Sequence, residues 1–579
     1  MKGRRRLLAA ALALATFSVL SAGKLSLPYP PQGELGYVSI DPYKVSPLTA
    51  IIDLGGKNIA DVKVKVHGKG KGGVDIEYDV GPTKILTYNG VPIVGLYPSH
   101  KNKVSVSYTV EGTIKNEEYT ILTAGLPYNP VDGDVRFVPE FEPVTVADNF
   151  KDRLYFFNLM SRKPEISQFR WGSDGGAAEW DTKPLNVIAD TNGDIRWMLD
   201  PNSQHDEESV YTSGVMIGTN QAPDGMLITG QGQRLFKFDL LGRHTMVRRL
   251  PRGFQDYSHD LEQLKNGNFI VRVAKRDYVR DDGVVVNTVR DHVIEIDRDG
   301  NVLDVWDFNK ILDPYRDNLL LALDVGAVCL NVDTESEGET LEDLDKNAPF
   351  GDIPGVGPGR NWAHINSVQY SYHDDSIIVS ARHQGTIKVG RDKQVKWILA
   401  PSEGWTGDLA SKVLTPVDAK GNNLKCDNGK CEGEFDWPWT QHTSYIGKTN
   451  NSVISFDNGD GRGFEQPAFP TDKFSRAVQY EVNEADMTVQ QVWQYGEERG
   501  YEWYSPITSL TQYFDDKDSM VIFSASRGLF DRENPPELSL VEMEYEGSEV
   551  FVEMNVKMPK LHAPGYRAWP ISIDAMFGN

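Results

Sequence analysis

The strongest constraint on the fold is a two-part pattern that recurs along the chain after about residue 145. Each copy is a β-rich run that ends in a short apolar strand, followed by two strands joined by a tight turn. The clearest copy reads HDLEQLKNGNFIVRV and then HVIEIDRDGNVLDVWDF, within residues 259–308. Its apolar residues alternate with the period of a strand, and NGN and RDGN are typical hairpin turns. Each repeat is therefore expected to contain four strands.

The second half of this pattern occurs six times. The copies lie at residues 185–199, 235–247, 293–308, 387–399, 478–496 and 540–556. Repeats of roughly 40 to 50 residues with four strands each are typical of β-propellers, whose blades bury their faces against neighbouring blades. We therefore predict an all-β protein in which residues 131–579 form a six-bladed β-propeller. An array of β-sandwiches is the alternative, and the steady position of the Trp-bearing hairpin favours the propeller.

The residues before the repeats predict two further segments. Residues 24–130 alternate in VKVKVHGKG, GVDIEYDV and VSVSYTVEG, which predicts a small β-sandwich that ends near the Pro- and Gly-containing boundary at 126–134. Residues 1–23 combine a basic start with an apolar run that is too short for a membrane span and then with small residues. This pattern predicts a cleaved signal peptide, so we expect an exported protein that does not insert into the membrane, and the resemblance described below implies the periplasm.

Two of the three cysteines are close together. Cys426 and Cys431 flank the turn-forming tetrapeptide DNGK, which brings their sulfur atoms together, and an exported protein lies in an oxidising compartment. A disulfide is therefore favoured over the alternative of two free buried thiols. A zinc site would need more ligands at short spacing. Cys329 is isolated and is interpreted as a buried apolar residue.

The formal net charge of −23 argues against nucleic acids and anionic membrane surfaces as partners, because both require a basic footprint. A small anionic substrate remains possible if positive groups gather in one pocket.

Three repeats begin with a histidine at the same position. These are His259, His364 and His442, each about 10 to 13 residues before the next apolar strand. Equivalent positions in a propeller share one radius and height, so we expect the three side chains to converge near the axis from blades 3, 4 and 5. His364 and His442 also follow the two long inserts, residues 310–361 and 400–440.

Further polar groups are expected beside these histidines. Arg382 ends the strand that returns along the one following His364, and Asn366 lies two residues after His364. Together they predict an anion site. Each residue also has a plainer interpretation, since a single histidine often fixes a turn and a single arginine often forms a surface ion pair. Three histidines can also bind a metal, although Arg382 would repel a cation and Asp260 is expected to point away.

These residues resemble those of a known family, the bacterial aryl-sulfate sulfotransferases, which are nucleotide-independent periplasmic enzymes. The resemblance covers nearly the whole mature chain and rests on HDLEQLKNGNFI, on NWAHINSV followed by ARHQG, and on a cysteine pair followed by DWPWTQHTS. It implies a six-bladed propeller with a small N-terminal β-domain, usually a homodimer, without a cofactor or metal.

The resemblance also implies roles for individual residues. A sulfuryl group would pass from a phenolic sulfate donor to a phenol acceptor by a ping-pong route, with His442 as the nucleophile that becomes sulfohistidine. His259, His364, Asn366 and Arg382 match the sulfuryl-binding positions, and Cys426 with Cys431 match the family's disulfide, which would need oxidative folding machinery. Which of His259 and His364 is the general acid stays open. Two other functions remain as alternatives, namely a metal-dependent sulfatase or phosphoesterase and a noncatalytic propeller that binds an anionic ligand.

Overall fold

A computed structural model describes residues 34–126, 138–160, 184–204, 215–327, 336, 338–343, 350–464, 472–561 and 563–578. The predicted signal peptide, most of the predicted boundary at 126–134 and Cys329 lie outside the described residues. The chain is all-β as predicted. Its described α-helices are short, and they are α1 (Pro82–Tyr88), α2 (Pro201–Gln204), α3 (Phe308–Ile311), α4 (Gly407–Ala410) and α5 (Ile573–Phe577). No helix in the described part of the chain is long and apolar enough to cross a membrane.

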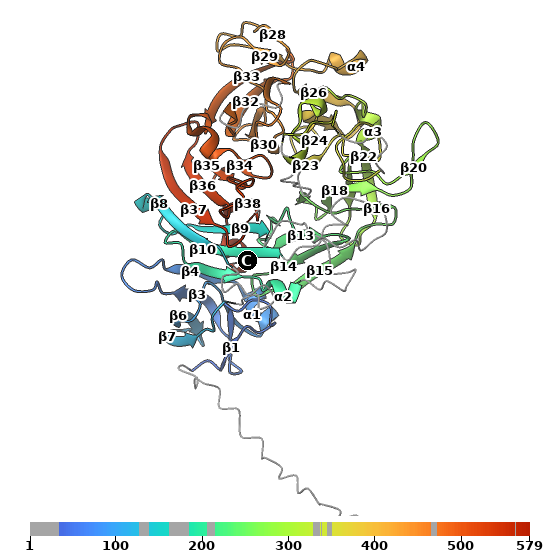
Figure 1. Cartoon of the computed structure of the whole chain (residues 1–579). Helices are drawn as coiled ribbons and strands as arrows, with labels where there is room; N and C mark the ends of the chain where they lie inside the picture. Colours follow the sequence, from blue (N-terminus) through green and yellow to red (C-terminus); the bar gives the residue numbers. More distant parts are fainter. Residues whose placement is uncertain are drawn as a thin grey trace, which may run out of the picture.

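After residue 138 the described strands form six sheets of four or five strands, which succeed one another around the molecule in Figure 1. The first three are sheet 1, with β9 (Leu154–Met160), β10 (Pro184–Asp190), β11 (Ile195–Met198) and β38 (Gly565–Pro570); sheet 2, with β12 (Asn220–Gln221), β13 (Leu227–Gln231), β14 (Arg234–Phe238) and β15 (His244–Arg249); and sheet 3, with β16 (Phe254–Gln255), β17 (Leu261–Gln263), β18 (Phe269–Lys275), β21 (His292–Ile296) and β22 (Val302–Asp307).

The other three are sheet 4, with β23 (Ile365–Ser371), β24 (Ser376–Ala381), β25 (Gly385–Gly390) and β26 (Val395–Leu399); sheet 5, with β27 (Thr415–Pro416), β30 (His442–Ile446), β31 (Ser452–Asp457), β32 (Arg476–Asn483) and β33 (Thr488–Tyr495); and sheet 6, with β8 (Glu140–Val146), β34 (Leu510–Phe514), β35 (Ser519–Ser524), β36 (Glu537–Glu544) and β37 (Val550–Lys557). Two separate hairpins project from the sheets, β19–β20 (Tyr278–Val279 and Val285–Val286) and β28–β29 (Cys426–Asp427 and Lys430–Cys431).

The six hairpins expected from the sequence are present in the six sheets. They are the antiparallel pairs β10–β11, β14–β15, β21–β22, β25–β26, β32–β33 and β36–β37. Every pair has a register shift, near the turn in all of them except β32–β33, where it lies in the middle of the pair. At each shift the outer strand carries one extra residue, such as Arg196 immediately before Trp197. A β-bulge of this kind increases the local twist. The six hairpins therefore share one local distortion as well as one sequence pattern.

One strand from each sheet lines a common cavity. Its volume is about 380 Å³, and it is lined by residues of β38, β12, β17, β23, β30 and β34, which come from sheets 1 to 6 in turn. The innermost strands of all six sheets therefore surround one space. This arrangement brings residues at equivalent positions of different repeats close to one another.

The two ends of this region complete each other's sheets. The C-terminal strand β38 pairs with β9 in sheet 1, with Trp569 opposite Phe156, and β8 pairs with β37 as the outer strand of sheet 6. Neither pairing was predicted, because neither strand belongs to the recurring hairpin. Sheet 1 therefore contains strands from the beginning and the end of the region.

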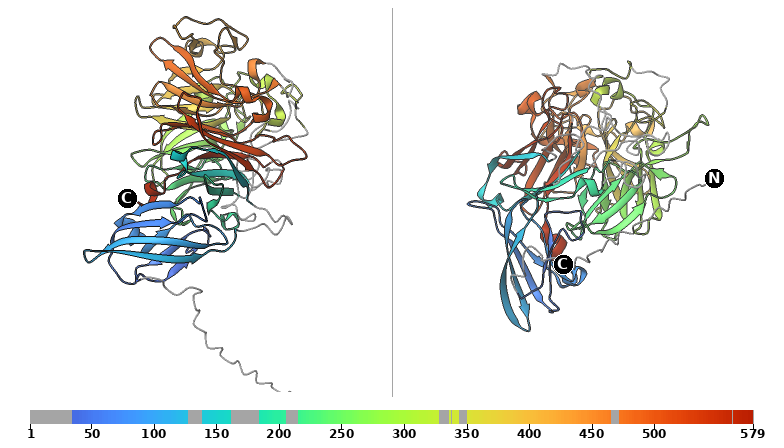
Figure 2. Two further views of the ribbon diagram at one scale, coloured as in Figure 1. Left: turned by 90° about the vertical axis from the view of Figure 1, so that its left-hand side faces the viewer. Right: turned by 60° about the horizontal axis from the view of Figure 1, so that its bottom comes forward.

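The N-terminal segment contains two sheets, β1-β2-β5 and β4-β3-β6-β7, and the predicted alternating runs are strands in the second of them. Their strands are β1 (Val38–Ile40), β2 (Ala50–Asp53), β3 (Ala60–Val66), β4 (Ile76–Val80), β5 (Gly90–Ile93), β6 (Lys101–Val110) and β7 (Thr113–Leu122). This segment packs beside sheet 1 in Figure 2. Arg196 of β11 donates to the carbonyl oxygens of Gly95 and Val74, and its guanidinium lies 3.8 Å from the ring centre of Tyr97. One buried apolar core runs from these sheets into sheets 1 and 6.

Candidate active site

The three histidines at the start of repeats lie together. His259 lies two residues before β17, His364 immediately precedes β23, and His442 is the first residue of β30. The ring centres of His259 and His364 are 5.3 Å apart, and those of His364 and His442 are 6.4 Å apart. All three side chains are fully buried. The structure thus gathers imidazoles from sheets 3, 4 and 5 into one cluster.

The backbone at this cluster has an unusual conformation. His259 has φ 70° and His364 has φ 50°, both in the left-handed region that non-glycine residues rarely adopt. The close approach of Gly218 accommodates His259, because a Cβ atom on Gly218 would lie 2.0 Å from the His259 carbonyl oxygen. Left-handed residues persist where surrounding contacts hold them, and they cluster at functional sites.

Asn458 and Thr508 fix the tautomer of His442. The side-chain nitrogen of Asn458 donates to the carbonyl oxygens of Ser505 and Thr508, so its side-chain oxygen faces His442 and accepts a hydrogen bond from Nδ1 at 2.7 Å. The Thr508 backbone N–H donates to Nε2 at 3.2 Å. His442 therefore carries its proton on Nδ1 and a lone pair on Nε2, which is the form an imidazole nucleophile needs.

A fourth histidine, His383, holds the guanidinium of Arg382. Nδ1 of His383 donates to the carbonyl oxygen of Asn361 at 2.9 Å, so its Nε2 can accept from Nη1 of Arg382 at 3.1 Å. Nη2 of Arg382 donates to the carbonyl oxygen of Pro506 at 3.2 Å, and the Arg382 backbone N–H donates to the carbonyl oxygen of His364. The fully buried Arg382 is thus anchored within the histidine cluster.

Asn366 is tied to the segment before the nucleophile. Its side-chain nitrogen donates to the carbonyl oxygen of Gln441 at 2.8 Å, and its own carbonyl oxygen accepts from Arg567 Nη2 at 3.3 Å. The register of β23 shifts between Ile365 and Ser367, so Asn366 is the extra residue of a bulge. Because of this bulge, the regular two-residue alternation of a strand does not hold between His364 and Asn366.

His364 and His259 have different hydrogen-bond partners. The Asn361 side-chain nitrogen donates to Nδ1 of His364 at 2.9 Å, whereas Nδ1 of His259 lies 2.5 Å from the hydroxyl oxygen of Ser258. Nε2 of His364 has no hydrogen-bond partner among the described residues.

The cluster is positively charged and favours neutral imidazoles. Burial lowers the pKa of all four histidines well below the usual value, and nearby guanidinium groups lower it further. The charges that contribute most after burial are Arg290 for His259 and His364 and Arg382 for His383 and His442. Such a site lowers the energy of a bound anion and of a neutral nucleophile together.

Carboxylates border the cluster without joining it. Asp260 accepts from Arg567 Nη1 at 2.7 Å and from the hydroxyl of Tyr445 at 3.0 Å. Asp460 lies 3.9 Å from Nη2 of Arg382, and burial raises its pKa to about 6. Within the described ranges, no group of three or more His, Cys, Asp or Glu residues could hold a metal ion.

The cysteines and tryptophans before His442 belong to a tightly packed segment that leads to this residue. A disulfide joins Cys426 and Cys431 across the β28–β29 hairpin, and a Cβ atom on Gly429 at the hairpin tip would lie 2.7 Å from the Trp439 ring. Trp437 and Trp439 are almost fully buried, and so is Trp362 before His364. All three indoles pack in one apolar cluster of sheets 3 to 5.

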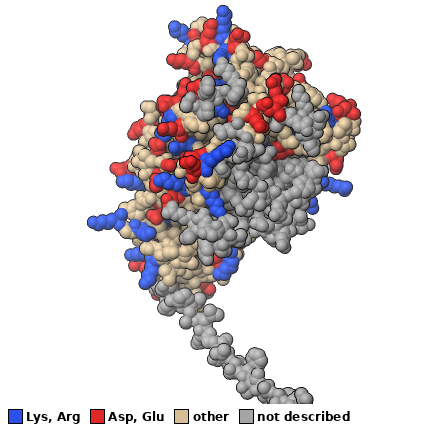
Figure 3. All heavy atoms as spheres, viewed as in Figure 1, with Lys and Arg blue, Asp and Glu red and all other residues tan. Residues whose placement is uncertain are grey.

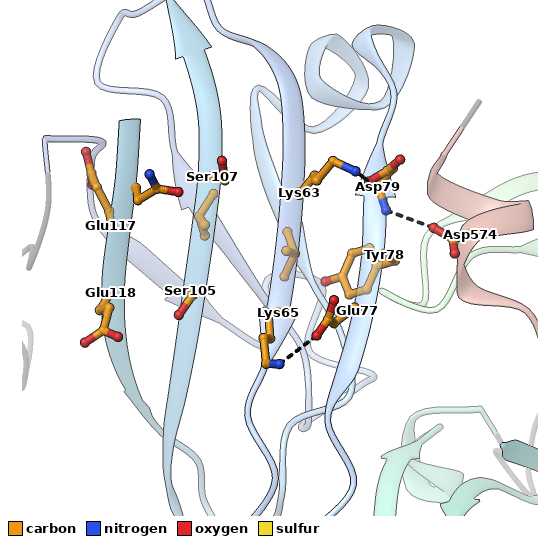
Figure 4. A pocket seen from close by; sticks show the side chains of 13 residues that line it. Lys63, Lys65, Glu77, Tyr78, Asp79, Ser105, Ser107, Glu117, Glu118 and Asp574 are labelled. Atoms are coloured by element: carbon orange, nitrogen blue, oxygen red, sulfur yellow. Dashed lines mark hydrogen bonds and ion pairs between the residues drawn. The ribbon is translucent and has the colours of Figure 1, made fainter. Parts of the chain in front are cut away.

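One hollow in the described part of the chain lies away from this cluster. The outer face of β4-β3-β6-β7 carries a hollow of about 480 Å³, shown in Figure 4. Its lysines are already paired, since Lys65 lies 2.6 Å from Glu77 and Lys63 lies 3.3 Å from Asp79. Over the face seen in Figure 3, basic and acidic side chains are interspersed.

Several residues of this candidate site were not predicted from the sequence. His383 stands next to Arg382 in ARHQG, but it does not share the position of the other three histidines in the repeat. Asn458 follows the end of β31 as Arg382 follows the end of β24, so a comparison of strand ends would have found it. Asn361 comes from a long insert and Arg567 from the C-terminal strand, and neither has a repeat signal.

Comparisons with known proteins identify the family of this chain. The profile of the family described as arylsulfotransferase (ASST) matches residues 140–567, and that of the arylsulfotransferase Ig-like domain matches residues 37–124. An arylsulfate sulfotransferase AssT of Escherichia coli O6:H1 is 46% identical over 584 residues, covering 98% of this chain and 97% of that protein. One of Lelliottia amnigena is 44% identical over 585 residues, covering 98% of both chains. The resemblance inferred from the sequence motifs is thereby confirmed, and the chain belongs to the arylsulfotransferase family.

Proposed function

We propose that this protein is an aryl-sulfate sulfotransferase that moves a sulfuryl group from a phenolic sulfate ester to a phenol acceptor. The names of the two relatives and their identity over the full length support this activity. The observation that carries the proposal is the buried cluster of His259, His364, His383 and His442 beside Arg382. It combines a neutral nucleophile with fixed positive charge, which is what the transfer of an anionic group requires.

His442 is the proposed nucleophile. Its Nε2 lone pair attacks sulfur, the N–S bond forms as the O–S bond breaks, and the electron pair leaves with the phenolic oxygen, which takes up a proton. A phenol then gives up its proton, its oxygen attacks the sulfohistidine, and the N–S bond breaks. A phenol leaves readily because its pKa is about 10. The transfer is therefore a ping-pong route through a covalent intermediate.

The remaining groups hold the sulfuryl oxygens during transfer. Arg382 supplies charge, the imidazoles of His259 and His364 supply N–H donors, and the second amide hydrogen of Asn366 is available beside Gln441. Donors fixed in advance stabilise the transferring group much as clamps stabilise a phosphoryl group. The N–H of Thr508, which now donates to Nε2 of His442, would lie beside the sulfuryl oxygens after Nε2 has bonded to sulfur.

The proposal includes the architecture and location expected from the sequence. The common cavity lined by all six innermost strands supports a six-bladed propeller over residues 131–579, and the two N-terminal sheets support a β-sandwich over residues 24–130. The disulfide supports a periplasmic protein with a signal peptide at residues 1–23 and help from oxidative folding machinery. We also propose a homodimer without a cofactor, by analogy with the family.

A test of the covalent route is intact mass measured after a brief mix with 4-nitrophenyl sulfate and no acceptor, at neutral to alkaline pH. Wild type should gain one SO3 group that added phenol removes, and His442→Asn should gain none. Nitrophenol release that needs a metal, without an adduct, would favour a metal-dependent hydrolase. Binding of the ester without release of nitrophenol would favour a noncatalytic binding protein.

A further inference from the structure

The side-chain amide of Asn361 has only one possible orientation. Its nitrogen donates to Asp352 Oδ1 at 2.9 Å and to Nδ1 of His364 at 2.9 Å. If the amide were flipped, its oxygen would face the carboxylate of Asp352, which is a strongly unfavourable contact. Both amide hydrogens are therefore used, and Nδ1 of His364 must be an acceptor. The ring proton of His364 is on Nε2.

The carboxylate that fixes this amide is itself fixed. Both oxygens of Asp352 accept from the guanidinium of Arg290, and both side chains are buried, with Arg290 fully so. The backbone carbonyl of Arg290 also accepts from the N–H of Ile365, next to His364. The chain Arg290–Asp352–Asn361 therefore reaches His364 through charge-assisted hydrogen bonds, which are stronger than neutral ones.

The groups around His364 disfavour a second proton on its ring. A proton on Nδ1 would point at the N–H of Asn361. The rings of His259, His383 and His442 lie within 6.4 Å, centre to centre. Arg290 and Arg382 are the cationic groups that face His364. None of these neighbours is an anion, so His364 is held as a neutral imidazole that donates from Nε2.

His259 has an adaptable partner instead. Its Nδ1 lies 2.5 Å from the Ser258 hydroxyl oxygen, which also accepts from the guanidinium of Arg272. A hydroxyl can donate its own hydrogen to Nδ1 or accept a hydrogen from it. His259 can therefore be neutral or doubly protonated without losing this hydrogen bond. The groups around it include the rings of His364 and Tyr566, the imidazole of His442 and the charges of Arg290, Arg272 and Arg567.

We propose that Asn361 is a positioning residue that keeps His364 neutral and protonated on Nε2, so that His364 only donates a hydrogen bond to the transferring sulfuryl group, while His259 moves the proton. This assignment rests on the proposed function. Protonated His259 gives its Nε2 proton to the departing phenolic oxygen as the O–S bond breaks. The neutral ring then takes the hydroxyl proton of the acceptor phenol as that oxygen attacks sulfur. The negative charge of the bound ester favours the protonated form of His259 despite the surrounding arginines.

The first test uses aryl sulfates whose phenols differ in pKa, with His259→Gln and His364→Gln compared side by side. His259→Gln should lower the first-turnover rate by about 10-fold with 4-nitrophenyl sulfate and about 1,000-fold with phenyl sulfate, because a poor leaving group needs a proton. His364→Gln should lower the rate by a similar factor for every donor, because a sulfuryl contact is independent of the leaving group. A steeper dependence in His364→Gln than in His259→Gln would overturn the assignment.

The second test needs no turnover. In protein labelled with 15N-histidine, the His364 signal, assigned by its loss in His364→Gln, should show one neutral tautomer with the proton on Nε2 between pH 5.5 and 8.5. Asn361→Asp places an acceptor opposite Nδ1, so there the signal should titrate. A wild-type His364 that titrates, or that carries its proton on Nδ1, would overturn the proposal. If this signal behaves as expected but no His442 adduct forms, the proposed function fails while the role of Asn361 stands.

Discussion

His442 donates its Nδ1 proton to the side-chain oxygen of Asn458 across 2.7 Å, and the amide nitrogen of Asn458 is bound to two backbone carbonyls. Asn458 is therefore a rigid acceptor, which fixes both the orientation and the tautomer of the imidazole. Because the acceptor is an uncharged amide, it does not add a negative charge that would stabilise the sulfonated ring. This suits the proposed ping-pong route, in which the sulfohistidine must pass its sulfuryl group on to a second phenol.

Replacing Asn458 with alanine should slow the formation of the adduct. His442 would lose the acceptor that holds its proton on Nδ1, and we expect a loss of roughly 10- to 100-fold, as for other residues that orient a reactive histidine. Rapid-quench intact mass with 4-nitrophenyl sulfate measures the rate. His373→Gln, at an exposed position, serves as the control. An unchanged rate in Asn458→Ala would show that the hydrogen bond does not orient the nucleophile.

The substitution Arg382→Lys should impair the enzyme although it keeps the charge. The guanidinium of Arg382 contacts His383 and the Pro506 carbonyl through its two terminal nitrogens. The single ammonium group of lysine cannot make both contacts. We expect kcat/KM for 4-nitrophenyl sulfate to fall by roughly 10- to 100-fold, mainly through kcat. His383→Gln, which can still accept from Nη1, should cost less than His383→Leu. Equal losses in the two His383 variants would argue against a role for the acceptor.

Folding stability should depend on pH through His364. Burial lowers its pKa in the folded state, so below about pH 6.5 the unfolded chain binds a proton that the folded protein excludes. The free energy of unfolding should therefore decrease as the pH falls, by up to about 1.4 kcal/mol per pH unit from this residue. Urea unfolding between pH 5 and 7.5 should show a shallower decrease for His364→Gln than for wild type. A parallel decrease would mean that His364 is protonated in the folded protein.

The β28–β29 hairpin offers a contrast between stability and positioning. Removing the disulfide with Cys426→Ser and Cys431→Ser should cost about 2 kcal/mol, because the loop that it closes is short. Gly429→Ala keeps the disulfide but introduces a Cβ atom at φ 74° against the Trp439 ring. When variants are compared at the same fraction of folded protein, Gly429→Ala should therefore lower the rate of adduct formation more than the double serine variant does. The reverse order would show that the disulfide, rather than the packing of the hairpin tip against Trp439, positions His442.

The sequence predicted the features that recur in each repeat, but few of the features that occur only once in the chain. The six hairpins and the position of His259, His364 and His442 were visible because each recurs at a fixed place in the pattern. The contacts that set the protonation states were not visible, because Asn361 and Asp352 belong to an insert of their own and meet Arg290 only in the folded chain. The expectation that Asn366 lies beside His364, two residues further along, assumed a regular strand, whereas β23 has a bulge there. Local pattern thus located the cluster, and long-range contacts determine its chemistry.

The pairing of β38 with β9 sets the order in which the site can be assembled. Arg567 on β38 binds both Asp260 and the carbonyl of Asn366, and Tyr566 packs against His259. A chain that is still being synthesised or exported lacks these residues until β38 has emerged. The site is therefore incomplete in every nascent chain that lacks β38, and it can form only after β38 has paired with β9.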